Sequence, residues 1–179
     1  MATEIELKVW IDDISSIEKR LKSSMVYTGS YTKHDEYWRS PQLKLGNGIR
    51  LRIGEDGVCT VNWKYKEVRD SIEVNDEHEF TVSSRDEYAL FLKTLGFSPW
   101  IRKIKRGNAY RDGKILAELS EIEGLGHFLE LEILAGDDSP ATIAAARKAL
   151  FDCLERLEIP RERIETRYYT SMLAEKSGK

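Results

Sequence analysis

Hydrophobic and polar residues alternate strictly at the start of the chain. Residues 3–10 carry Thr, Ile, Leu and Val at odd positions and Glu, Glu, Lys and Trp at even positions. A period of two is typical of a β-strand, whose successive side chains point to opposite faces. Comparable stretches predict further strands over residues 34–39, 49–53, 58–66, 73–82, 100–106, 109–111, 115–122 and 128–134.

Three other segments repeat their apolar residues every three or four positions, which predicts amphipathic helices. They cover residues 13–23, the stretch that follows Ser83 or Ser84 and ends at Gly96, and Ser139-Pro140 to about Leu157. An aspartate or a serine precedes each helix as its N-cap. The expected apolar faces are Ile14, Ile17 and Leu21 in the first, Tyr88, Phe91, Leu92 and Leu95 in the second, and Ile143, Ala146, Leu150 and Leu154 in the third.

Short turns, rather than long crossovers, join the predicted strands. They are expected at Ser40-Pro41, Gly46-Asn47-Gly48, Gly54 to Gly57, Asp112-Gly113 and Gly124-Leu125-Gly126. Short connections favour antiparallel neighbours, because a parallel pair needs a crossover of about a dozen residues or more. We therefore expect an α+β fold in one domain over residues 1–175. Short helical segments are expected from Pro160 and over residues 168–175, and a disordered tail at 176–179.

The polar faces of these strands carry charges whose sign is mostly uniform within a strand. The pairs are Glu4/Glu6 with Lys8 beside them, Arg50/Arg52, Lys64/Lys66, Glu77/Glu79, Lys103/Lys105 and Glu130/Glu132. For any single strand, a solvent-exposed face is the better interpretation. Across so many strands that interpretation weakens, because like charges placed side by side cost free energy. A barrel with its charged faces inside explains the segregation.

Segregated acidic and basic faces suit a metal ion and a polyanion together. Mg²⁺ and Mn²⁺ prefer oxygen ligands from carboxylates, water and substrate phosphates. Lys and Arg neutralise a triphosphate, and Arg can grip two of its oxygens at once. Phosphoryl transfer needs in-line geometry and charge stabilisation more than a covalent nucleophile. The sequence carries no serine–histidine, cysteine–histidine or P-loop signature that would indicate a different chemistry.

Composition narrows the classes of partner. The 179 residues are 41% hydrophobic and 33% charged, with a formal net charge of −3, which argues against a nucleic-acid partner. Cys59 and Cys153 lie outside any zinc-binding spacing and are expected to be reduced thiols. Charges begin at Glu4, and no apolar run approaches the length of a membrane span. We expect a cytoplasmic protein with no membrane partner.

The segment Glu4-Ile5-Glu6-Leu7-Lys8 resembles the E-x-E-x-K signature of the CYTH superfamily, also called triphosphate tunnel metalloenzymes. Further matches follow in the order of the family: Asp35-Glu36-Tyr37-Trp38, Ile49-Arg50-Leu51-Arg52, Trp63-Lys64, Glu77-His78-Glu79, Lys103-Ile104-Lys105-Arg106 and the long block from Glu123 to Glu132. The resemblance covers nearly the whole chain and ends near Tyr168-Tyr169. The superfamily includes class IV adenylate cyclases, thiamine triphosphatases and inorganic triphosphatases.

The resemblance implies an eight-stranded antiparallel barrel, with helices packed outside and a triphosphate bound in its tunnel. It implies that Glu4, Glu6 and Lys8 are catalytic, and that Mg²⁺ or Mn²⁺ binds Glu4, Glu6, Glu130 and Glu132. The implied phosphate-binding residues are Lys8, Arg50, Arg52, Lys64, Lys66, Lys103, Lys105 and Arg106. Candidate tunnel acids are Glu77 and Glu79, which are expected to pair with the basic set, and Glu118.

Three positions depart from the family pattern. The family usually has an aspartate at the position of Ser120, an arginine at Gly107 and an arginine at Asn75. Glu118 shares the strand face of Ser120 and is a candidate substitute for the aspartate, and Arg106 is a candidate for the displaced arginine. These departures leave the fold expectation intact, and leave the substrate and the reaction open.

Three functions follow from these observations. The leading one is hydrolysis of a nucleoside, thiamine or inorganic triphosphate, because a positioned water attacking the terminal phosphorus suffices and no adenine site is identifiable. The first alternative is conversion of ATP to cyclic AMP and pyrophosphate, as in class IV adenylate cyclases. The second is a non-catalytic module that holds a triphosphate or polyphosphate. A nucleic acid is the least expected ligand, and a homodimer is the default assembly.

Overall fold

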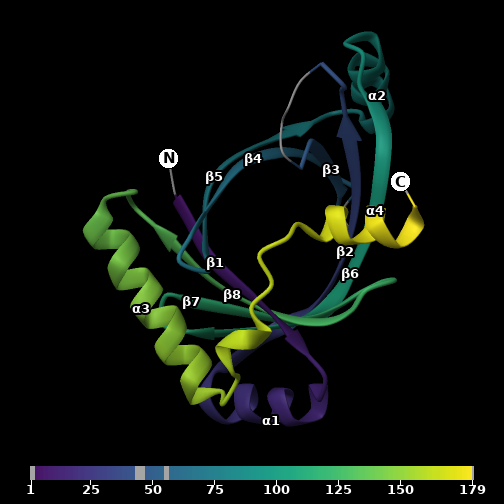
Figure 1. Ribbon diagram of the computed structural model, residues 1–179. Coiled ribbons are helices and arrows are strands. Elements are labelled where there is room, and N and C mark those ends of the chain that lie inside the picture. Colours follow the sequence, from purple (N-terminus) through teal and green to yellow (C-terminus); the bar gives the residue numbers. More distant parts are fainter. Residues whose placement is uncertain (1–2, 43–46, 55–56, 179) are drawn as a thin grey trace. The chain divides into compact units, whose positions relative to one another are not determined.

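A computed structural model describes residues 3–42, 47–54 and 57–178, and its strands close into a barrel (Figure 1). The strands are β1 (Thr3–Ile11), β2 (Val26–Arg39), β3 (Ile49–Ile53), β4 (Cys59–Arg69), β5 (Ile72–Val82), β6 (Ser98–Asp112), β7 (Ile115–Ile122) and β8 (Gly126–Ala135). Their hydrogen-bonded order is β1-β5-β4-β3-β2-β6-β7-β8, and β8 pairs with β1. The pairs β1/β5, β1/β8, β2/β3, β3/β4 and β7/β8 are antiparallel. The predicted α+β class and eight-stranded antiparallel barrel are confirmed.

The chain forms two compact units, which are described separately. Unit 1 consists of Met1–Tyr31, Lys66–Asp76 and Arg106–Thr166. Unit 2 consists of Thr32–Tyr65, Glu77–Lys105 and Arg167–Lys179. The division falls within β2, β4, β5 and β6 and, between Thr166 and Arg167, in the connection that precedes the last helix.

Unit 1 buries the apolar faces of its strands against α1 (Ile14–Ser24) and α3 (Pro140–Arg156). The Ser139 hydroxyl accepts a hydrogen bond from the Thr142 backbone N–H at 3.3 Å and caps α3, as predicted. The predicted apolar stripe of α3 is buried, and the helix lies along β8 and β1 (Figure 1). On β1, Ile5 and Leu7 have no exposed surface beneath this layer. The alternation at the start of the chain therefore builds one wall of the core.

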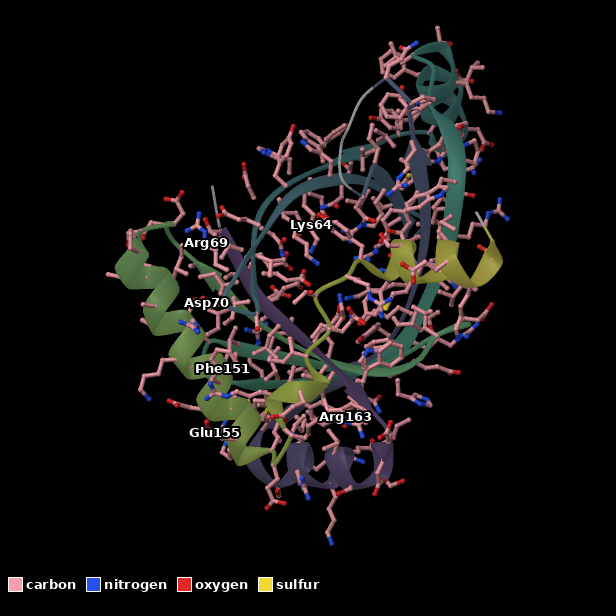
Figure 2. The ribbon with its side chains drawn as sticks, viewed as in Figure 1. Lys64, Arg69, Asp70, Phe151, Glu155 and Arg163 are labelled. Atoms are coloured by element: carbon pink, nitrogen blue, oxygen red, sulfur yellow. The ribbon has the colours of Figure 1, made fainter. Side chains whose placement is uncertain are left out.

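The outer surface of α3 also holds the short 3₁₀ helix η1 (Arg161–Arg163) in place. The Arg161 guanidinium lies 4.2 Å from the ring centre of Phe151, and its Nη2 lies 2.7 Å from Glu155 Oε1. Figure 2 shows Phe151 and Glu155 on α3, and Arg163 on the segment that follows it. The segment expected to begin at Pro160 is therefore a single turn fastened to α3.

In unit 2, helix α2 (Arg85–Thr94) begins behind Ser84, whose hydroxyl accepts a hydrogen bond from the Glu87 N–H at 3.2 Å. Its apolar face was predicted only in part. Leu92 is buried as expected, but Phe91 and Leu95 are 53% and 51% exposed, and Ala89 is buried instead. Residues three apart share a helix face, so Ala89 accompanies Leu92 while Phe91 points away. Because Ala89 is small and only weakly apolar, the hydrophobic pattern did not identify it as part of the buried face of α2.

The expectation that helices pack outside does not hold for α4 (Tyr169–Ser177). Ala174 of this helix clusters with Tyr37 of β2 and Ile101 of β6. Because strand side chains alternate, Tyr37 and Ile101 lie on the same face as Asp35 and Lys103. These two apolar residues interrupt the charged face of unit 2, and burying them stabilises a helix on that face rather than on the opposite one.

Two strands differ most from their predicted bounds. β2 begins at Val26 rather than at residue 34. Residues 26–33 have no buried side chain and no apolar alternation, so the sequence pattern did not reveal this part of the strand. β6 is one strand where a break near Gly107 was expected. A Cβ atom at Gly107 would lie 2.3 Å from the Leu119 carbonyl oxygen, so this glycine permits a close approach of β7 instead of ending the strand.

The predicted turns at 46–48 and 54–57 include residues that lie outside the described part of the chain. Within residues 3–42, 47–54 and 57–178, the helices are too short or too polar to cross a membrane.

Candidate functional site

The charged face of β1 is buried, although it alternates with an apolar one. Glu4 and Glu6 are each 9% exposed, and Lys8 is 4% exposed. A strand with one wet face would leave these side chains in water. The solvent-exposed interpretation is therefore wrong for this strand, and the carboxylates need partners inside the protein.

Strand register places more carboxylates beside them in unit 1. Glu6 is directly opposite Glu73 of β5 and Glu132 of β8. One row further along, Lys8 is opposite Glu130, which is itself opposite Glu118 of β7. Directly opposed residues point to the same face, so these rows form one acidic surface, named here the carboxylate face. It consists of Glu4, Glu6, Glu73, Glu118, Glu130 and Glu132.

Glu73 is a site residue that the sequence prediction missed. It is 2% exposed, and its Oε1 lies 2.6 Å from Lys66 Nζ and 3.6 Å from Lys8 Nζ. The available signal was parity, because residues 73, 77 and 79 share one face of β5. The predicted strand begins at residue 73, so Glu73 stands at its edge and outside the Glu77/Glu79 pair.

Lys66 and Asn75 make further contacts with the carboxylate face. Lys66 donates to the Thr166 carbonyl oxygen at 2.5 Å as well as contacting Glu73. Asn75, at a family arginine position, donates from its Nδ2 to Glu4 Oε2 at 3.1 Å. A neutral amide thus occupies the place beside Glu4 where an arginine would bring a positive charge. The face keeps more of its negative charge as a result.

Electrostatics on this face favour an added positive charge. Burial, followed by the charge of Glu6, raises the pKa of Glu73 to about 7, against the opposing effects of Lys8 and Lys66. Burial lowers the pKa of Lys66, although Glu73 opposes that shift. Carboxylates that face each other at this burial repel one another unless a proton or a cation lies between them.

The predicted metal ligands lie on this face in neighbouring rows. Glu6 is next to Glu132, while Glu4 and Glu130 stand one row to either side of them. Among the described residues, no group of three or more His, Cys, Asp or Glu side chains is already gathered as a metal cage. The donor set nevertheless fits Mg²⁺ or Mn²⁺ in its chemistry, since it consists of carboxylate oxygens facing one another.

Unit 2 carries a different cluster, centred on Asp35. Its side chain has no exposed surface, and Arg52 donates to both of its oxygens at 2.6 and 2.9 Å. Lys103 Nζ lies 3.0 Å from Asp35 Oδ2. Burial opposes ionisation of Asp35, but Lys103 and Arg52, assisted by Arg50, outweigh it and hold the pKa of Asp35 well below its usual range. Asp35 therefore stays ionised and fixes two of the predicted phosphate ligands.

The other predicted basic residues of unit 2 lie on the same strand faces. Arg50 Nη2 is 3.3 Å from Glu77 Oε1 and 3.8 Å from Glu79 Oε2, and Asn62 also donates to Glu77. Lys105 is 4% exposed, and Lys64 is half-buried on β4 (Figure 2). Cationic groups and carboxylates are interleaved here, with the cations in excess.

Lys103 also has aromatic neighbours. Its Nζ lies 5.6 Å from the ring centre of Tyr37 and 5.3 Å from that of Tyr169 at the start of α4. Both ring faces attract the ammonium group, and Asp35 holds it from another side. The position of Lys103 is therefore determined by α4 as well as by the sheet.

Arg106 does not join the basic set. It lies on the opposite face of β6 from Lys103 and Lys105, its side chain is 48% exposed, and it pairs with Glu123 at 3.1 Å. Strand parity placed it there, since position 106 follows Lys105 directly. The idea that it replaces a displaced arginine has no support in this arrangement.

Gly107 and Ser120, two departures from the family pattern, are neighbours. A Cβ at Gly107 would lie 2.8 Å from both Cα and Cβ of Ser120. Ser120 is 3% exposed, and its Oγ has no hydrogen-bond partner among the described residues. Glu118 lies one row away, opposite Glu130, whereas Ser120 is opposite Phe128. The two departures are therefore adjacent in the structure, and both positions carry small residues.

Comparison with known proteins now identifies the family. The CYTH domain matches residues 2–169 of the chain. The chain belongs to the CYTH domain family. The match extends through both units, so the carboxylate face and the Asp35 cluster are parts of one CYTH domain.

Two curated CYTH relatives are named as adenylate cyclases. A candidate adenylate cyclase of Methanocaldococcus jannaschii is 27% identical over 175 residues, covering 94% of this chain and 97% of the relative. An adenylate cyclase of Aeromonas hydrophila is 25% identical over 174 residues, covering 94% of this chain and 87% of the relative.

Solved structures agree on the fold. A Pyrococcus horikoshii protein superposes with a TM-score of 0.84 at 25% identity, covering 97% of this chain and 99% of that one. A candidate adenylyl cyclase from Hippeastrum, described as having a dominant triphosphatase activity, superposes with a TM-score of 0.66 at 16% identity. The latter covers 100% of this chain and 97% of the other, and its likeness concerns the fold alone.

Proposed function

We propose that this CYTH protein is a metal-dependent enzyme that hydrolyses a triphosphate. The main support for the proposal is that one CYTH domain buries two charged surfaces, one rich in carboxylates and the other rich in cations. The carboxylate face has opposed, buried carboxylates and needs a cation. The Asp35 cluster and its neighbours have an excess of buried or half-buried cations and need an anion.

The carboxylate face would bind the metal through Glu4, Glu6, Glu130 and Glu132. When bound, Mg²⁺ or Mn²⁺ supplies charge neutralisation and positions a water molecule. Lys8 and Lys66 hold Glu73 at 3.6 and 2.6 Å, so this carboxylate remains oriented while its neighbours bind the cation. Glu73 is also a group that can take up or release a proton near neutral pH, because its pKa is raised to about 7.

The basic set of unit 2 would bind the phosphates. Arg52 and Lys103 are already held by Asp35, so little side-chain freedom remains to be lost when an anion binds. Arg50 is poised similarly by Glu77 and Glu79. Groups fixed in this way stabilise the charge that develops on transferring phosphoryl oxygens without reorganising first.

We favour hydrolysis over cyclisation because it has fewer geometric requirements. It needs only a water positioned beside the terminal phosphorus, whereas cyclisation needs a ribose hydroxyl held in line with the α-phosphorus. The main support for cyclisation is the name of two relatives at 27% and 25% identity, so ATP cyclisation is the second candidate.

A direct assay tests the proposal. The purified chain is incubated with tripolyphosphate, thiamine triphosphate or ATP, each with Mg²⁺, Mn²⁺ or EDTA, while orthophosphate, pyrophosphate and cyclic AMP are measured. We expect metal-dependent release of orthophosphate, which EDTA stops. Glu130→Gln should lose it, whereas Glu123→Gln, which changes an exposed carboxylate paired with Arg106, should retain it. Accumulation of cyclic AMP with pyrophosphate would establish the cyclase instead, and binding without any product would establish a non-catalytic module.

A further inference from the structure

A separate cavity of about 300 Å³ opens on unit 2, and its main lining comes from the strand faces opposite the Asp35 cluster. Three strands line it with His34, Glu36, Leu51, Ile53, Arg102 and Ile104. Asp35 and Lys103, which lie between these residues in the sequence, also contribute to the lining. Strand pairing sets His34 opposite Ile53 and Glu36 opposite Leu51, so these side chains share one face. We name this cavity the outer pocket. Its volume is at the lower end of the range usual for small-molecule sites, about 300–1,000 Å³.

The floor of the outer pocket is apolar and its rim is charged. Leu51 is 1% exposed and Ile53 is 42% exposed, so the floor runs from a buried to an accessible aliphatic side chain. Glu36 sits at the rim with both carboxylate oxygens occupied. Arg102 Nη2 lies 3.0 Å from Oε1, and Arg85 contacts Oε2. Glu36 therefore serves as an anchor that holds two guanidinium groups near each other.

Arg102 has binding capacity left over. Its side chain is 81% exposed, so most of its five N–H donors remain accessible while it contacts Glu36. A planar guanidinium beside an apolar floor matches a carboxylate attached to an apolar body, because the fork of N–H groups donates to both carboxylate oxygens in parallel. The exposed imidazole of His34 on the same rim supplies a further polar partner.

The outer pocket and the Asp35 cluster are built from alternating residues of the same strands. His34 and Glu36 flank Asp35, Leu51 and Ile53 flank Arg52, and Arg102 and Ile104 flank Lys103. Successive side chains of a strand point to opposite faces while sharing one backbone. A shift of these backbones that suits a ligand on one face therefore changes the geometry of the ion pairs on the other.

We propose that the outer pocket binds a small organic carboxylate with an apolar body, and that its occupancy is transmitted to the Asp35, Arg52 and Lys103 cluster. The site lies on the opposite strand faces from the proposed phosphate-binding residues. By linkage, any effect of the carboxylate on triphosphate affinity would be matched by an equal effect of triphosphate on carboxylate affinity.

Binding is tested with 4-fluorobenzoate, observed by ¹⁹F NMR on the full chain. We expect saturable binding that a saturating amount of tripolyphosphate does not abolish. Arg102→Gln should weaken it by about tenfold, the usual effect of losing one hydrogen bond to a charged group. Ile53→Thr should weaken it by a smaller factor, because it places a hydroxyl in the apolar floor.

The matched control is Arg69→Gln, since Arg69 is also an exposed arginine paired with one glutamate, Glu67, at 2.6 Å, and it is not among the residues that line the pocket. It should bind 4-fluorobenzoate as the parent chain does. Equal loss in Arg69→Gln, absence of saturable binding, or full displacement by tripolyphosphate would each overturn the assignment of the site.

Transmission is tested on the cluster itself, with no need for enzymatic activity. The Nε–H of Arg52 donates to Asp35 Oδ1 at 2.6 Å, and its ¹⁵N–¹H signal is the probe. We expect 4-fluorobenzoate to shift this signal with the same midpoint as the ¹⁹F titration. The shift should vanish in Arg102→Gln at concentrations that saturate the parent. Binding that leaves the Arg52 signal in place would refute transmission, and failure of the triphosphatase assay would leave both measurements interpretable.

Discussion

Unit 1 and unit 2 each bury a carboxylate beside cationic groups, yet the pKa values of the two carboxylates are shifted in opposite directions. Glu73 in unit 1 lies between Glu6, Lys8 and Lys66, and its pKa is raised to about 7. Asp35 in unit 2 lies between Arg52 and Lys103, and its pKa is lowered. Burial penalises both anions, so the difference comes from their neighbours. In unit 1 the negative charge of Glu6 opposes the two lysines, whereas in unit 2 a third cation, Arg50, adds to the effect of Arg52 and Lys103.

The proposed function requires this contrast, because a metal ion and a polyanion need surfaces of opposite charge. Carboxylates outnumber lysines on the carboxylate face, and cations outnumber carboxylates around Asp35. Leaving such charge buried costs free energy in the empty protein, and a bound ion of the opposite sign removes that cost. Four sets of variants test this difference between the two units, from the largest expected effect to the smallest.

Removing the carboxylate of unit 2 should have the largest effect on stability. Asp35→Ala leaves Arg52 and Lys103 without the anion that holds them, and breaking a buried ion pair from one side typically costs about 3–5 kcal/mol. Urea denaturation monitored by circular dichroism measures the change. The control is Asp86→Ala, which removes an 86%-exposed partner of Arg85 and should cost about 1 kcal/mol or less. Similar losses in the two variants would mean that Asp35 is not the organising anion of its cluster.

Neutralising the central carboxylate of unit 1 should act on activity instead. Glu6 faces both Glu73 and Glu132, so Glu6→Gln removes the charge at the middle of the row. We expect turnover of the preferred triphosphate to fall by about 100-fold or more, as for the loss of a group that stabilises transition-state charge. Stability should hold or improve, because a buried like-charge contact disappears. Retained turnover at saturating metal would remove Glu6 from the metal-binding set.

The close approach of β6 and β7 in unit 1 should tolerate no side chain at position 107. Gly107→Ala places a methyl group 2.3 Å from the Leu119 carbonyl oxygen, and such overpacking typically costs about 1–3 kcal/mol. Gly136→Ala is the matched control in the same unit, since a Cβ there has open space within 4 Å. Thermal and urea denaturation compare the two. An unchanged Gly107→Ala would show that β7 can move and that an arginine could return to this position.

Glu73 predicts the smallest effect and a specific pH dependence. Its folded pKa of about 7 exceeds the ordinary value of 4.5, so the folded chain binds more protons than the unfolded chain between these values. Stability contributed by this group is therefore fully present below pH 4.5 and is lost as pH rises through about 7. The slope cannot exceed about 1.4 kcal/mol per pH unit for one group.

Urea denaturation at intervals between pH 5 and pH 8 should reveal this slope in the parent chain and a flatter profile in Glu73→Gln. Mg²⁺ should reduce the slope, because a cation replaces the proton at the carboxylate face. Identical profiles for parent and Glu73→Gln would mean that Glu73 is ionised throughout, like Asp35.

Much of the site could be predicted because strand parity is a local property. Glu4, Glu6 and Lys8 share a face whatever β1 pairs with, and the same holds for Arg50 with Arg52 and for Lys103 with Lys105. Helix caps were predictable for the same reason, since Ser139 and Ser84 bond to backbone groups three residues away. Parity also excludes Arg106, which the family pattern had suggested including.

Other features could not be predicted from local pattern. Glu73 gained its importance from Glu6, 67 positions earlier by residue number, through a register that only strand pairing defines. Ala89 proved to be a core residue of α2 because of the surface it faces, and Gly107 proved to be inside a strand because of the backbone beside it. In each case the deciding partner lies far away in the sequence.

By itself, the sequence determined which residues share a strand face, where the long helices begin and that acidic and basic pairs are segregated, since these depend on neighbours a few residues apart. Tertiary structure alone decided that these faces are buried, that Glu73 meets Glu6 while Asp35 meets Arg52 and Lys103, and that α4 covers Tyr37. The physical reason is that the pKa and the ion-binding capacity of a buried group depend on burial and on charges within a few ångströms. Those neighbours are supplied by strands and helices distant along the chain.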